Sequence, residues 1–523
     1  MSLLEISLSK EIISDHFGPI VEKVCTALIS KGRLLISQLI NYTKLTRLQV
    51  EKALFILIQQ NIVKYAEKPR TQLNYYSVDI NEVLMRIHFP IFIQAIKEIF
   101  GADGEEIAKL LLLHGRLSLT SLLTYVEDTD SIKNTFCSMV ATGFIIAVRP
   151  EDSVSMVDKL LTEEDIEVSK LGASLKANDV SRIRVSLAVR AENEYDNNVA
   201  TGMKRKAISN YDDYPSKSVY NSINDIDENI ISRLNYNKLL VHCRNECVIN
   251  LVKERLTPSA AELMKEILKI YTEEFNDCKR NSVAGPFSSA QLSYKIRDIK
   301  LKIDYSKGGG NKNPIVDYLE TYRLDSVKFL TKDVERGNGD YYLNILLCYF
   351  IQINNHMKID LIGNAIKEKY GSNSMRLWKI LLDKGKFDEK QIAKVALVSH
   401  VEARKCLFEL LNAGYTYIQE IPKTIDRNTM RSTFLWYTDM NKAEEQLISE
   451  CYKVLINLKK RRKIEIEKLS KLIEKSERDD VKKDKSLLSE AEIYALEELK
   501  KILNRIDISE VGIGKMLLIL KEF

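Results

Sequence analysis

The stretch TRLQVEKALFILIQQNIVKYAEKPRTQLNYYSV, residues 46–78, decides the fold because its hydrophobic period changes half-way along. Thr46 begins a helix with a capping box, in which the Thr46 hydroxyl accepts from the Gln49 backbone and the Gln49 side chain reaches back. Apolar residues at three- and four-residue steps predict its core face: Val50, Ala53, Leu54, Leu57 and Ile58. After Asn61 the period becomes two, which predicts a β-hairpin with a polar tip at 67–71.

Two more helices are expected upstream. Apolar residues at helical spacing predict one first helix that ends at Lys31-Gly32: Ile13, Phe17, Ile20, Val24 and Leu28. A second, short helix follows in LLISQLINY, residues 34–42. Three helices followed by a β-hairpin form a winged helix, which presents one exposed helix and a wing to DNA or to another protein.

This pattern repeats further along the chain. Shifting residues 46–63 by 353 positions gives SHVEARKCLFELLNAGYT, residues 399–416, with a second capping box predicted from Ser399 to Glu402. The two third helices end at Asn61 and Gly414, residue types that tolerate the left-handed conformation. The sequence therefore contains at least two copies of one fold.

Two more copies lie between these. A shift of 82 gives 128–145, preceded by predicted helices at 103–114 and 118–126. Another copy is predicted from helices at 241–256, 259–277 and 288–298, which lead through SKGGGNKNP at 306–314 to PIVDYLETYRLDSVKFL at 314–330. Residues 151–226 are polar, with few apolar side chains at a helical period, and are interpreted as an insertion in the second wing.

After residue 440 the pattern becomes that of a helical hairpin. Helices are expected at 441–473 and 487–507, separated by KSERDDVKKDKS at 475–486. Heptad spacing predicts their shared seam: Leu447, Cys451, Val454 and Leu458 in the first helix, and Leu488, Ala491, Ala495, Leu499, Ile502 and Ile506 in the second. The two helices are expected to pair as an antiparallel coiled coil.

The predicted fold class is mainly α, with tandem winged-helix domains and this C-terminal hairpin. The predicted domains are four winged helices, the second with the insertion, and the coiled coil: 1–88, 89–240, 241–338, 339–440 and 441–523.

Composition narrows the class of protein. The 523 residues carry 78 Lys+Arg and 73 Asp+Glu, so the net charge of +5 is too small to indicate nucleic-acid binding by itself. Eight cysteines include no CxxC pair, which is typical of reduced thiols in an intracellular protein. No apolar run approaches the ~18 to 20 residues of a membrane span, and no signal sequence is recognisable. We expect a soluble, cytosolic or nuclear protein with no membrane contact.

No motif for catalysis stands out. Cys243 and Cys247 lie one helical turn apart but have no second pair nearby, so they are interpreted as structural thiols and no metal site is expected. The glycines at 308–310 lack the Lys-Ser/Thr of a phosphate loop. Asp225 and Asp227 lack the third carboxylate of a nucleotidyl-transfer site. The sequence therefore predicts a binding protein without a cofactor.

Basic residues outside the core faces are the candidates for contacting DNA or a docking partner. In the first winged helix and its wing these are Arg47, Lys52, Lys68 and Arg70, and in the fourth they are Arg404, Lys405, Arg427 and Arg431. A solvated face is the alternative in the first copy, because Glu51 and Glu67 lie beside these cations. The second copy exposes Asp130, Lys133 and Asn134, which favours packing on protein.

The densest basic feature is KKRRK, formed by Lys459, Lys460, Arg461, Arg462 and Lys463. Five consecutive bases on a helix point to all sides, so they cannot form a single solvated stripe. Docking to an acidic surface, phosphate contact and nuclear import remain open, as does an unspecific solvated face. Lys204-Arg205-Lys206 in the insertion is a second candidate for an import signal.

Four segments together resemble a known family: HFGPIVEKVCTALISKGRLLISQLI (16–40), ALFILIQQNIV (53–63), ISRLNYNKLLVHCRNECVINLVKERL (231–256) and YIQEIPKTIDRNTMRSTFLWY (417–437). The family is the RNA polymerase III-specific subunit with four extended winged helices and a C-terminal coiled coil. The QEIPK and FLWY parts of the last wing are its more specific features.

The resemblance implies a nuclear protein that joins two other polymerase III-specific subunits in a peripheral heterotrimer. It further implies that this heterotrimer sits on the clamp of the largest subunit and supports promoter opening, with weak binding to single- or double-stranded promoter DNA. The alternative is a stand-alone interaction scaffold of the proteasome-lid or translation-initiation-factor type, without DNA contact.

Overall fold

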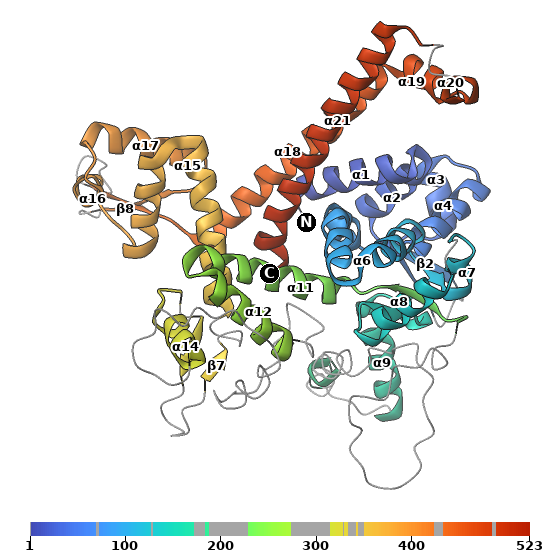
Figure 1. Ribbon diagram of the computed structural model, residues 1–523, viewed down its shortest axis with the longest axis horizontal. Coiled ribbons are helices and arrows are strands. Elements are labelled where there is room, and N and C mark those ends of the chain that lie inside the picture. The colour runs from blue at the N-terminus through green and yellow to red at the C-terminus, as the bar shows by residue number, and fades with distance from the viewer. Residues whose placement is uncertain are drawn as a thin grey trace. The chain divides into compact units, whose positions relative to one another are not determined.

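The computed structural model describes residues 2–68, 73–126, 129–171, 182, 184–187, 228–272, 314–327, 329–332, 341–343, 350–422, 432–483 and 488–523. The chain divides into two compact units, which meet in sequence at Cys243 and Arg244 (Figure 1). Within the described ranges no helix is long and apolar enough to cross a membrane.

The first unit begins with a winged helix. Its elements are α1 (Leu3–Phe17), α2 (Pro19–Lys31), α3 (Ile36–Thr43), α4 (Arg47–Gln59), β1 (Val63–Lys68) and β2 (Leu73–Val78), and the two strands pair antiparallel. The predicted second helix, third helix and hairpin are thus confirmed.

The single first helix predicted through residues 13–28 is wrong. The chain breaks at Gly18, which has φ 82° and ψ 178°, a conformation that L side chains rarely adopt. Pro19 then occupies the first turn of α2, where its missing N–H removes no helical bond. The dipeptide Gly18-Pro19 therefore makes two helices, α1 and α2, out of one continuous apolar pattern.

The third helix, α4, forms as its sequence predicts. The capping box joins Thr46 and Gln49, and Asn61 closes the helix at φ 61°. Four of the five predicted core residues are buried, while Ile58 is half-buried. Leu34 bridges to Tyr76, so the start of α3 is tied to the wing.

The second copy has the same plan in the same unit. It comprises α5 (Ile80–Met85), η1 (Arg86–His88), α6 (Phe89–His114), β3 (Leu117–Ser118), α7 (Leu119–Leu123), α8 (Thr129–Ala141), β4 (Ile145–Ala147), η2 (Pro150–Ser153) and β5 (Ile231–Leu234). The strand order is β3-β5-β4, so β5 returns after the insertion as the central strand. The helix expected at 118–126 is shorter than predicted.

Part of the insertion predicted at 151–226 is a regular helix. Residues Met156–Leu171 form α9. Ser155 caps this helix by accepting a hydrogen bond from the Asp158 backbone (3.2 Å), and Arg33 pairs with the Asp158 carboxylate at 2.7 Å. Polar contacts therefore hold α9, which explains why a search for an apolar period missed it. The import candidate Lys204-Arg205-Lys206 and most of 172–227 lie outside the described residues.

The junction between the first and second copies is tightly packed. Arg86, nearly buried, donates to Gln60 Oε1 at 2.6 Å and stacks over the Phe17 ring at 4.6 Å. Burial lowers the pKa of Arg86 to about 10. At Gly115, φ is 79° and an added Cβ would lie 2.4 Å from the Gln59 carbonyl oxygen. The backbones of the two copies therefore meet at this glycine.

The second unit contains the parts predicted as copies three and four. Its first elements are α11 (Tyr236–Arg255), which begins in the first unit, α12 (Pro258–Thr272), α14 (Pro314–Leu324), β6 (Leu330–Lys332) and β7 (Tyr341–Leu343). One apolar cluster from Val248 to Met357 joins them. The helix predicted at 288–298 lies outside the described residues.

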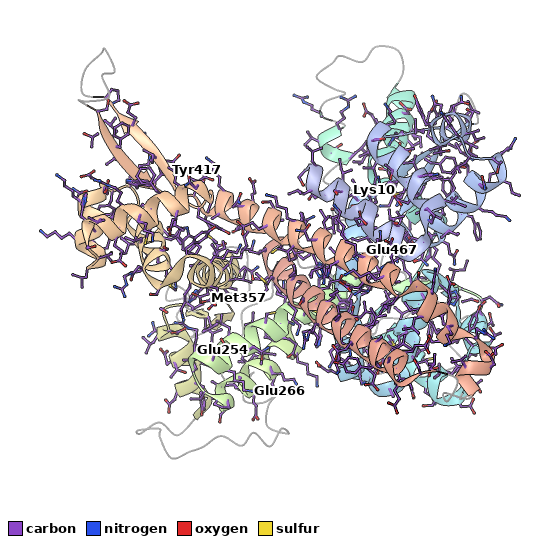
Figure 2. All side chains as sticks on the ribbon, turned by 90° about the horizontal axis from the view of Figure 1, so that it is seen from above. Lys10, Glu254, Glu266, Met357, Tyr417 and Glu467 are labelled. Atoms are coloured by element: carbon purple, nitrogen blue, oxygen red, sulfur yellow. The ribbon has the colours of Figure 1, made fainter. Side chains whose placement is uncertain are left out.

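The last winged helix has the same order of elements as the first, with a longer wing. It consists of α15 (Phe350–Lys384), α16 (Glu389–Ala396), α17 (His400–Asn412), β8 (Tyr417–Ile421) and β9 (Thr433–Tyr437). Helices α16 and α17 fall where the shift of 353 carries α3 and α4. Figure 2 shows the β8–β9 wing projecting from these helices, with Tyr417 near its base. The capping box predicted at Ser399 forms only in part, because the Glu402 side chain instead accepts from Asn373 Nδ2 at 2.6 Å.

Three copies share a pair of glycines that was not predicted from the sequence. Each copy has two glycines with positive φ at the same spacing, the first breaking the leading helix and the second ending the next one: Gly18 and Gly32, Gly101 and Gly115, Gly371 and Gly385. Because only glycine adopts these angles readily, the pairs mark the repeat more sharply than the apolar residues do.

The C-terminal helices form an antiparallel pair. Helix α18 (Met440–Lys468) lies beside α21 (Glu490–Leu517), with α19 (Ser470–Glu477) and α20 (Asp479–Lys483) between them in sequence (Figures 1 and 2). Contacts at the two ends of the pair show that the helices run in opposite directions. Lys475, after α18, pairs with Glu492 at the start of α21 at 2.8 Å, and Tyr452 in the first half of α18 accepts from Lys521, after α21, at 3.1 Å.

The predicted bounds and seam of this hairpin need correction. The first helix breaks at Leu469 instead of reaching 473, and the second continues to Leu517, beyond 507. Val454 is exposed and Leu455 is buried in its place. Helix α18 also packs against α15, so its buried stripe is wider than a two-helix heptad seam.

The end of the chain completes the core of the third copy. After α21 a short π-helix, η7 (Leu518–Glu522), brings Ile519 and Phe523 against the apolar cluster of α11, α12 and α14. Asn354 Nδ2 donates to the Phe523 carbonyl at 3.3 Å. The base of the hairpin is thereby anchored in the second unit.

Candidate nucleic-acid and docking surfaces

The exposed face of α4, the third helix of the first winged helix, carries charges of both signs. Arg47 donates through Nε to Glu51 Oε1 at 2.7 Å, and this hydrogen bond raises the pKa of the Arg47 guanidinium. Lys52 is exposed, and within the described part of the chain no ion pair involves it. Lys68 ends β1, with its side chain outside the description, and Arg70 lies outside the described residues.

The equivalent helix of the last copy, α17, has its predicted cations beside carboxylates. Arg404 Nε lies 2.6 Å from Glu389 Oε1 on α16, and Lys405 Nζ lies 4.0 Å from Glu409. Both cations remain more than half exposed. Arg427 and Arg431 lie outside the described residues. The guanidiniums of Arg47 and Arg404 are thus partly neutralised within their own winged helices.

The basic run at 459–463 points to several sides of α18, as its sequence predicts. Lys459 is nearly buried, and Lys460 is exposed. Arg461 pairs with Glu465 at 2.7 Å on the same helix. Arg462 instead crosses to α21, where it contacts Asp507 and lies 3.4 Å from Glu510. Part of the run therefore holds the hairpin together.

The second copy has a polar outward face. On α8, Asp130 and Asn134 are exposed, and Lys133 pairs with Glu228 at 3.3 Å. Cys137 is half-buried, and burial raises the pKa of its thiol.

Large apolar side chains on α4 and α17 are the surface feature that the sequence reading missed. Leu48 is 61% exposed and Phe55 70% exposed on α4, while Val401 is 80% and Phe408 46% exposed on α17. A signal was present, because these residues lie seven positions apart on each helix and outside its predicted core face. The Phe408 ring also packs edge-on against the buried Trp436, with 5.3 Å between the ring centroids.

A cavity of about 660 Å³ lies where α9 approaches the first wing. Arg33, Glu67 and Tyr75 line it from the winged helix, and Asp158, Leu161 and Asp165 line it from α9. Its charged groups have both signs and Arg33 is already paired with Asp158, so the cavity has no concentrated charge for an ionic ligand.

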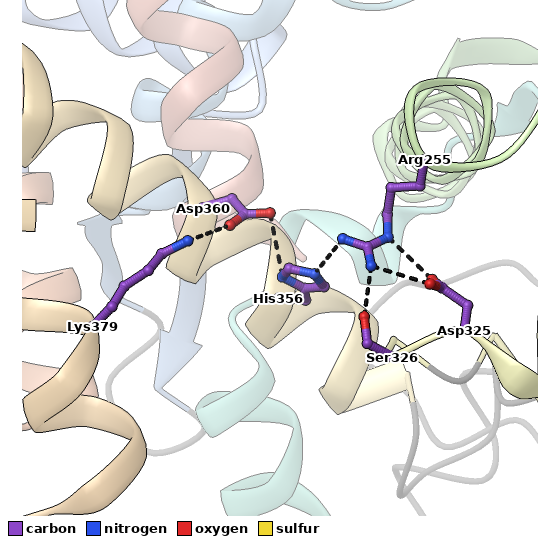
Figure 3. A network of polar contacts seen from close by, with 6 residues as sticks. All are labelled: Arg255, Asp325, Ser326, His356, Asp360 and Lys379. Atoms are coloured by element: carbon purple, nitrogen blue, oxygen red, sulfur yellow. Dashed lines mark hydrogen bonds and ion pairs between the residues drawn. The ribbon is translucent and has the colours of Figure 1, made fainter. Parts of the chain in front are cut away.

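A chain of polar contacts joins α11 and the end of α14 to α15 (Figure 3). Arg255 grips Asp325 with two hydrogen bonds, of 3.0 and 3.1 Å, and donates to Ser326 Oγ at 2.6 Å. Its third contact is with His356 Nε2 at 3.1 Å, and His356 Nδ1 lies 3.3 Å from Asp360, which also binds Lys379.

This chain of contacts joins helices and has no catalytic arrangement. Because an arginine can only donate, His356 Nε2 accepts, and Nδ1 carries the proton toward Asp360. Ser326 Oγ contacts Arg255, so serine and imidazole do not form a nucleophile–base pair.

The two thiols considered as metal ligands are packed in α11. Cys243 is buried, and burial raises the pKa of Cys247 to about 11. Across the described ranges no group of three or more His, Cys, Asp or Glu side chains is placed to hold a metal ion.

Known protein families match this chain along most of its length. Three family models match in chain order: the RNA polymerase III subunit RPC82 helix-turn-helix domain at residues 7–68, RNA polymerase III subunit RPC82 at 134–346, and the POLR3C C-terminal winged-helix domain at 362–438. The chain belongs to the RNA polymerase III subunit RPC82 family. The match covers the first and last winged helices and most of the chain between them.

Relatives of this family match over all or nearly all of the chain. "DNA-directed RNA polymerase III subunit RPC3" of Mus musculus is 24% identical over 100% of this chain and 98% of its own length. The Bos taurus protein of the same name is 25% identical, with 100% and 99% covered. The Emericella nidulans protein is 22% identical, with 93% and 94% covered. The polar insertion and the hairpin are therefore included in the similarity to the animal proteins.

Proposed function

We propose that this chain is a non-catalytic subunit of DNA-directed RNA polymerase III and acts in the nucleus. The observation that carries the proposal is the ordered match of three models of one polymerase III subunit along a chain of tandem winged helices. The relatives that match its full length have names that describe them as subunits of that polymerase. Nucleotide addition then belongs to other subunits.

Within the polymerase, the chain joins two other polymerase III-specific subunits in a peripheral heterotrimer on the clamp of the largest subunit. There it supports promoter opening by holding DNA near the clamp. Contacts that are weak one by one suffice in this role, because docking raises the effective concentration of DNA at each of them.

The candidates for phosphate contact are the exposed cations of the basic run and the cations that the sequence places in the two wings. In the run, Lys460 is exposed, whereas Arg462 contacts Asp507 across the hairpin. The wing residues Lys68, Arg70, Arg427 and Arg431 remain predictions. Since phosphate contacts read no bases, binding of the purified protein to single- or double-stranded DNA should be weak and without sequence preference.

Two measurements test this function. Native affinity purification of the tagged full chain should recover a multisubunit RNA polymerase, and recovery of proteasome-lid or translation factors instead would support the scaffold alternative. In a binding assay with fluorescent DNA, affinity should fall steeply from low to physiological salt. Salt-insensitive or strongly sequence-selective binding would rule out phosphate contact as the mode of DNA binding.

A further inference from the structure

Helices α4 and α17 carry the same outward pattern although they belong to different winged helices. On α4 the pattern is Leu48, Lys52 and Phe55, and on α17 it is Val401, Lys405 and Phe408. Positions i, i+4 and i+7 lie on one face of a helix and span about 10 Å. Each face therefore presents an exposed lysine between two exposed apolar side chains.

The fold itself does not require this pattern. The equivalent positions of α8, in a copy with the same backbone, hold Asp130, Asn134 and Cys137. A monomer gains no stability by exposing Leu48, Phe55 and Val401 to water. The apolar side chains recur on α4 and α17 but not on α8, which indicates a role in binding.

A strained residue extends the face of the last copy. Leu397 ends α16 in the left-handed conformation, with φ 55° and ψ 41°, and is 88% exposed. A bulky side chain costs about 1 to 2 kcal/mol in this conformation. Glycine would avoid that strain, and a side chain that is 88% exposed gains little from packing to compensate for it. It lies at the helix-turn-helix corner, four residues before Val401, and adds to the apolar surface there.

DNA is a poor occupant for these faces. The exposed helix of a winged helix reads DNA mainly through polar contacts to base edges and phosphates, and thymine methyl groups would cover only a small part of Phe55 and Val401. Arg47 and Arg404, the arginines of these two helices, already bind Glu51 and Glu389. A protein surface that is apolar around one negative charge complements both the apolar groups and the lysine.

We infer that α4 and α17 are protein-docking faces, each taking an amphipathic helix of another polymerase subunit that places a carboxylate between two apolar side chains. The carboxylate binds Lys52 or Lys405, and its apolar neighbours cover the side chains one turn to either side. This inference rests on the proposed function and assigns these two lysines to protein rather than to DNA.

Photo-crosslinking in the assembled enzyme tests the inference directly. The tagged full chain, carrying p-benzoylphenylalanine in place of Phe55 or Phe408, is purified with RNA polymerase III and irradiated, and the products are identified by mass spectrometry. Crosslinks to an acidic, apolar helix of another subunit are expected. Crosslinks to added promoter DNA, crosslinks confined to this chain, or no crosslink at all would overturn the inference.

Charge reversal supplies the second arm. Lys52→Glu and Lys405→Glu should lower the crosslink yield at the neighbouring phenylalanine by about tenfold, since an attraction becomes a repulsion. The exposed Leu3, outside both faces, serves as the matched control, and Leu3→Ser should leave the yield unchanged. Unchanged yields in the reversal variants would contradict the role of the lysines.

The two levels fail differently. If the unmodified chain does not purify with the polymerase, the proposed function fails. If it does purify and these faces contact no other subunit, only the docking inference fails.

Discussion

The first and fourth winged helices have the same pair of positive-φ glycines as the second copy. They differ from it in the side chains that their third helices expose. All three copies place two glycines with positive φ at the same spacing before the third helix. Yet α4 and α17 expose an apolar-lysine-phenylalanine face, whereas α8 exposes Asp130 and Asn134. The glycine pairs thus give the three copies the same backbone turns, while the exposed positions of their third helices differ in chemistry and can serve different functions.

The largest expected effect comes from a glycine at which the copies differ in surroundings. At Gly115 an added Cβ would lie 2.4 Å from the Gln59 carbonyl oxygen, whereas at the equivalent Gly32 and Gly385 it meets nothing within 4 Å. Gly115→Ala should lower the free energy of unfolding by about 3 to 5 kcal/mol, against about 1 to 3 kcal/mol for the other two, where only backbone strain acts.

Urea denaturation of the full chain, followed by circular dichroism, would measure all three variants. Equal losses at the three glycines would mean that the first and second copies are not in close contact at Gly115.

The next prediction compares a buried with an exposed residue of α4. Leu54 on α4 is buried and its neighbour Phe55 is 70% exposed. Leu54→Ala should lower the free energy of unfolding by about 2 to 4 kcal/mol, because it leaves a cavity, while Phe55→Ala should change it by about 0.5 kcal/mol or less. The same denaturation experiment measures both. A large loss for Phe55→Ala would show that this ring is covered within the protein and is not free to dock.

The repeat was predictable from sequence where local chemistry acts alone. The capping box at Thr46 forms as expected, and the shift of 353 places α16 and α17 to the residue. The break at Gly18 was missed because the apolar spacing continues across it, although Gly18-Pro19 is a strong break signal. Helix α9 was missed because a cap and an ion pair with Arg33, distant in sequence, hold it in place of an apolar stripe.

The candidate sites were predictable by residue type but not by environment. The i, i+4 pair of Arg47 with Glu51 can be read from spacing, whereas Arg404 meets Glu389 only through the packing of α17 on α16. In the basic run, sequence shows that five cations point to all sides. It cannot show that Arg462 faces Asp507 on a helix more than forty residues later.

A smaller effect sharpens the distinction between packed and outward cations in that run. Arg462→Gln removes the contacts with Asp507 and Glu510 and should lower the free energy of unfolding by about 0.5 to 1 kcal/mol, whereas Lys460→Gln should leave it unchanged. Replacing all five basic residues at once would therefore change the free energy of unfolding as well as binding, and the two effects could not be separated.

Fluorescent-DNA binding of the same two variants completes this test. If the run contacts phosphates, Lys460→Gln should weaken binding at low salt without loss of stability. If the run docks the subunit, recovery of the polymerase should fall instead, and if it serves import alone the purified variant should behave normally in both assays. A normal result in all of these assays, with normal nuclear entry, would make the run a solvated helix face.

The smallest effect has the opposite sign. Lys44 and Leu397 are equivalent residues that end α3 and α16 in the left-handed conformation, with φ 56° and 55°. Glycine removes the strain of about 1 to 2 kcal/mol but adds about 0.5 to 1 kcal/mol of unfolded-state entropy, so Lys44→Gly and Leu397→Gly should each stabilise the chain by about 0.5 kcal/mol. The variants are matched in backbone and differ in the side chain that is lost. Only Leu397→Gly removes apolar surface from the corner beside Val401, so it should lower the crosslink yield at Phe408 while Lys44→Gly leaves that yield unchanged. Equal yields for the two variants would show that Leu397 is not part of the docking face, and a loss of stability in either would show that strain does not govern that position.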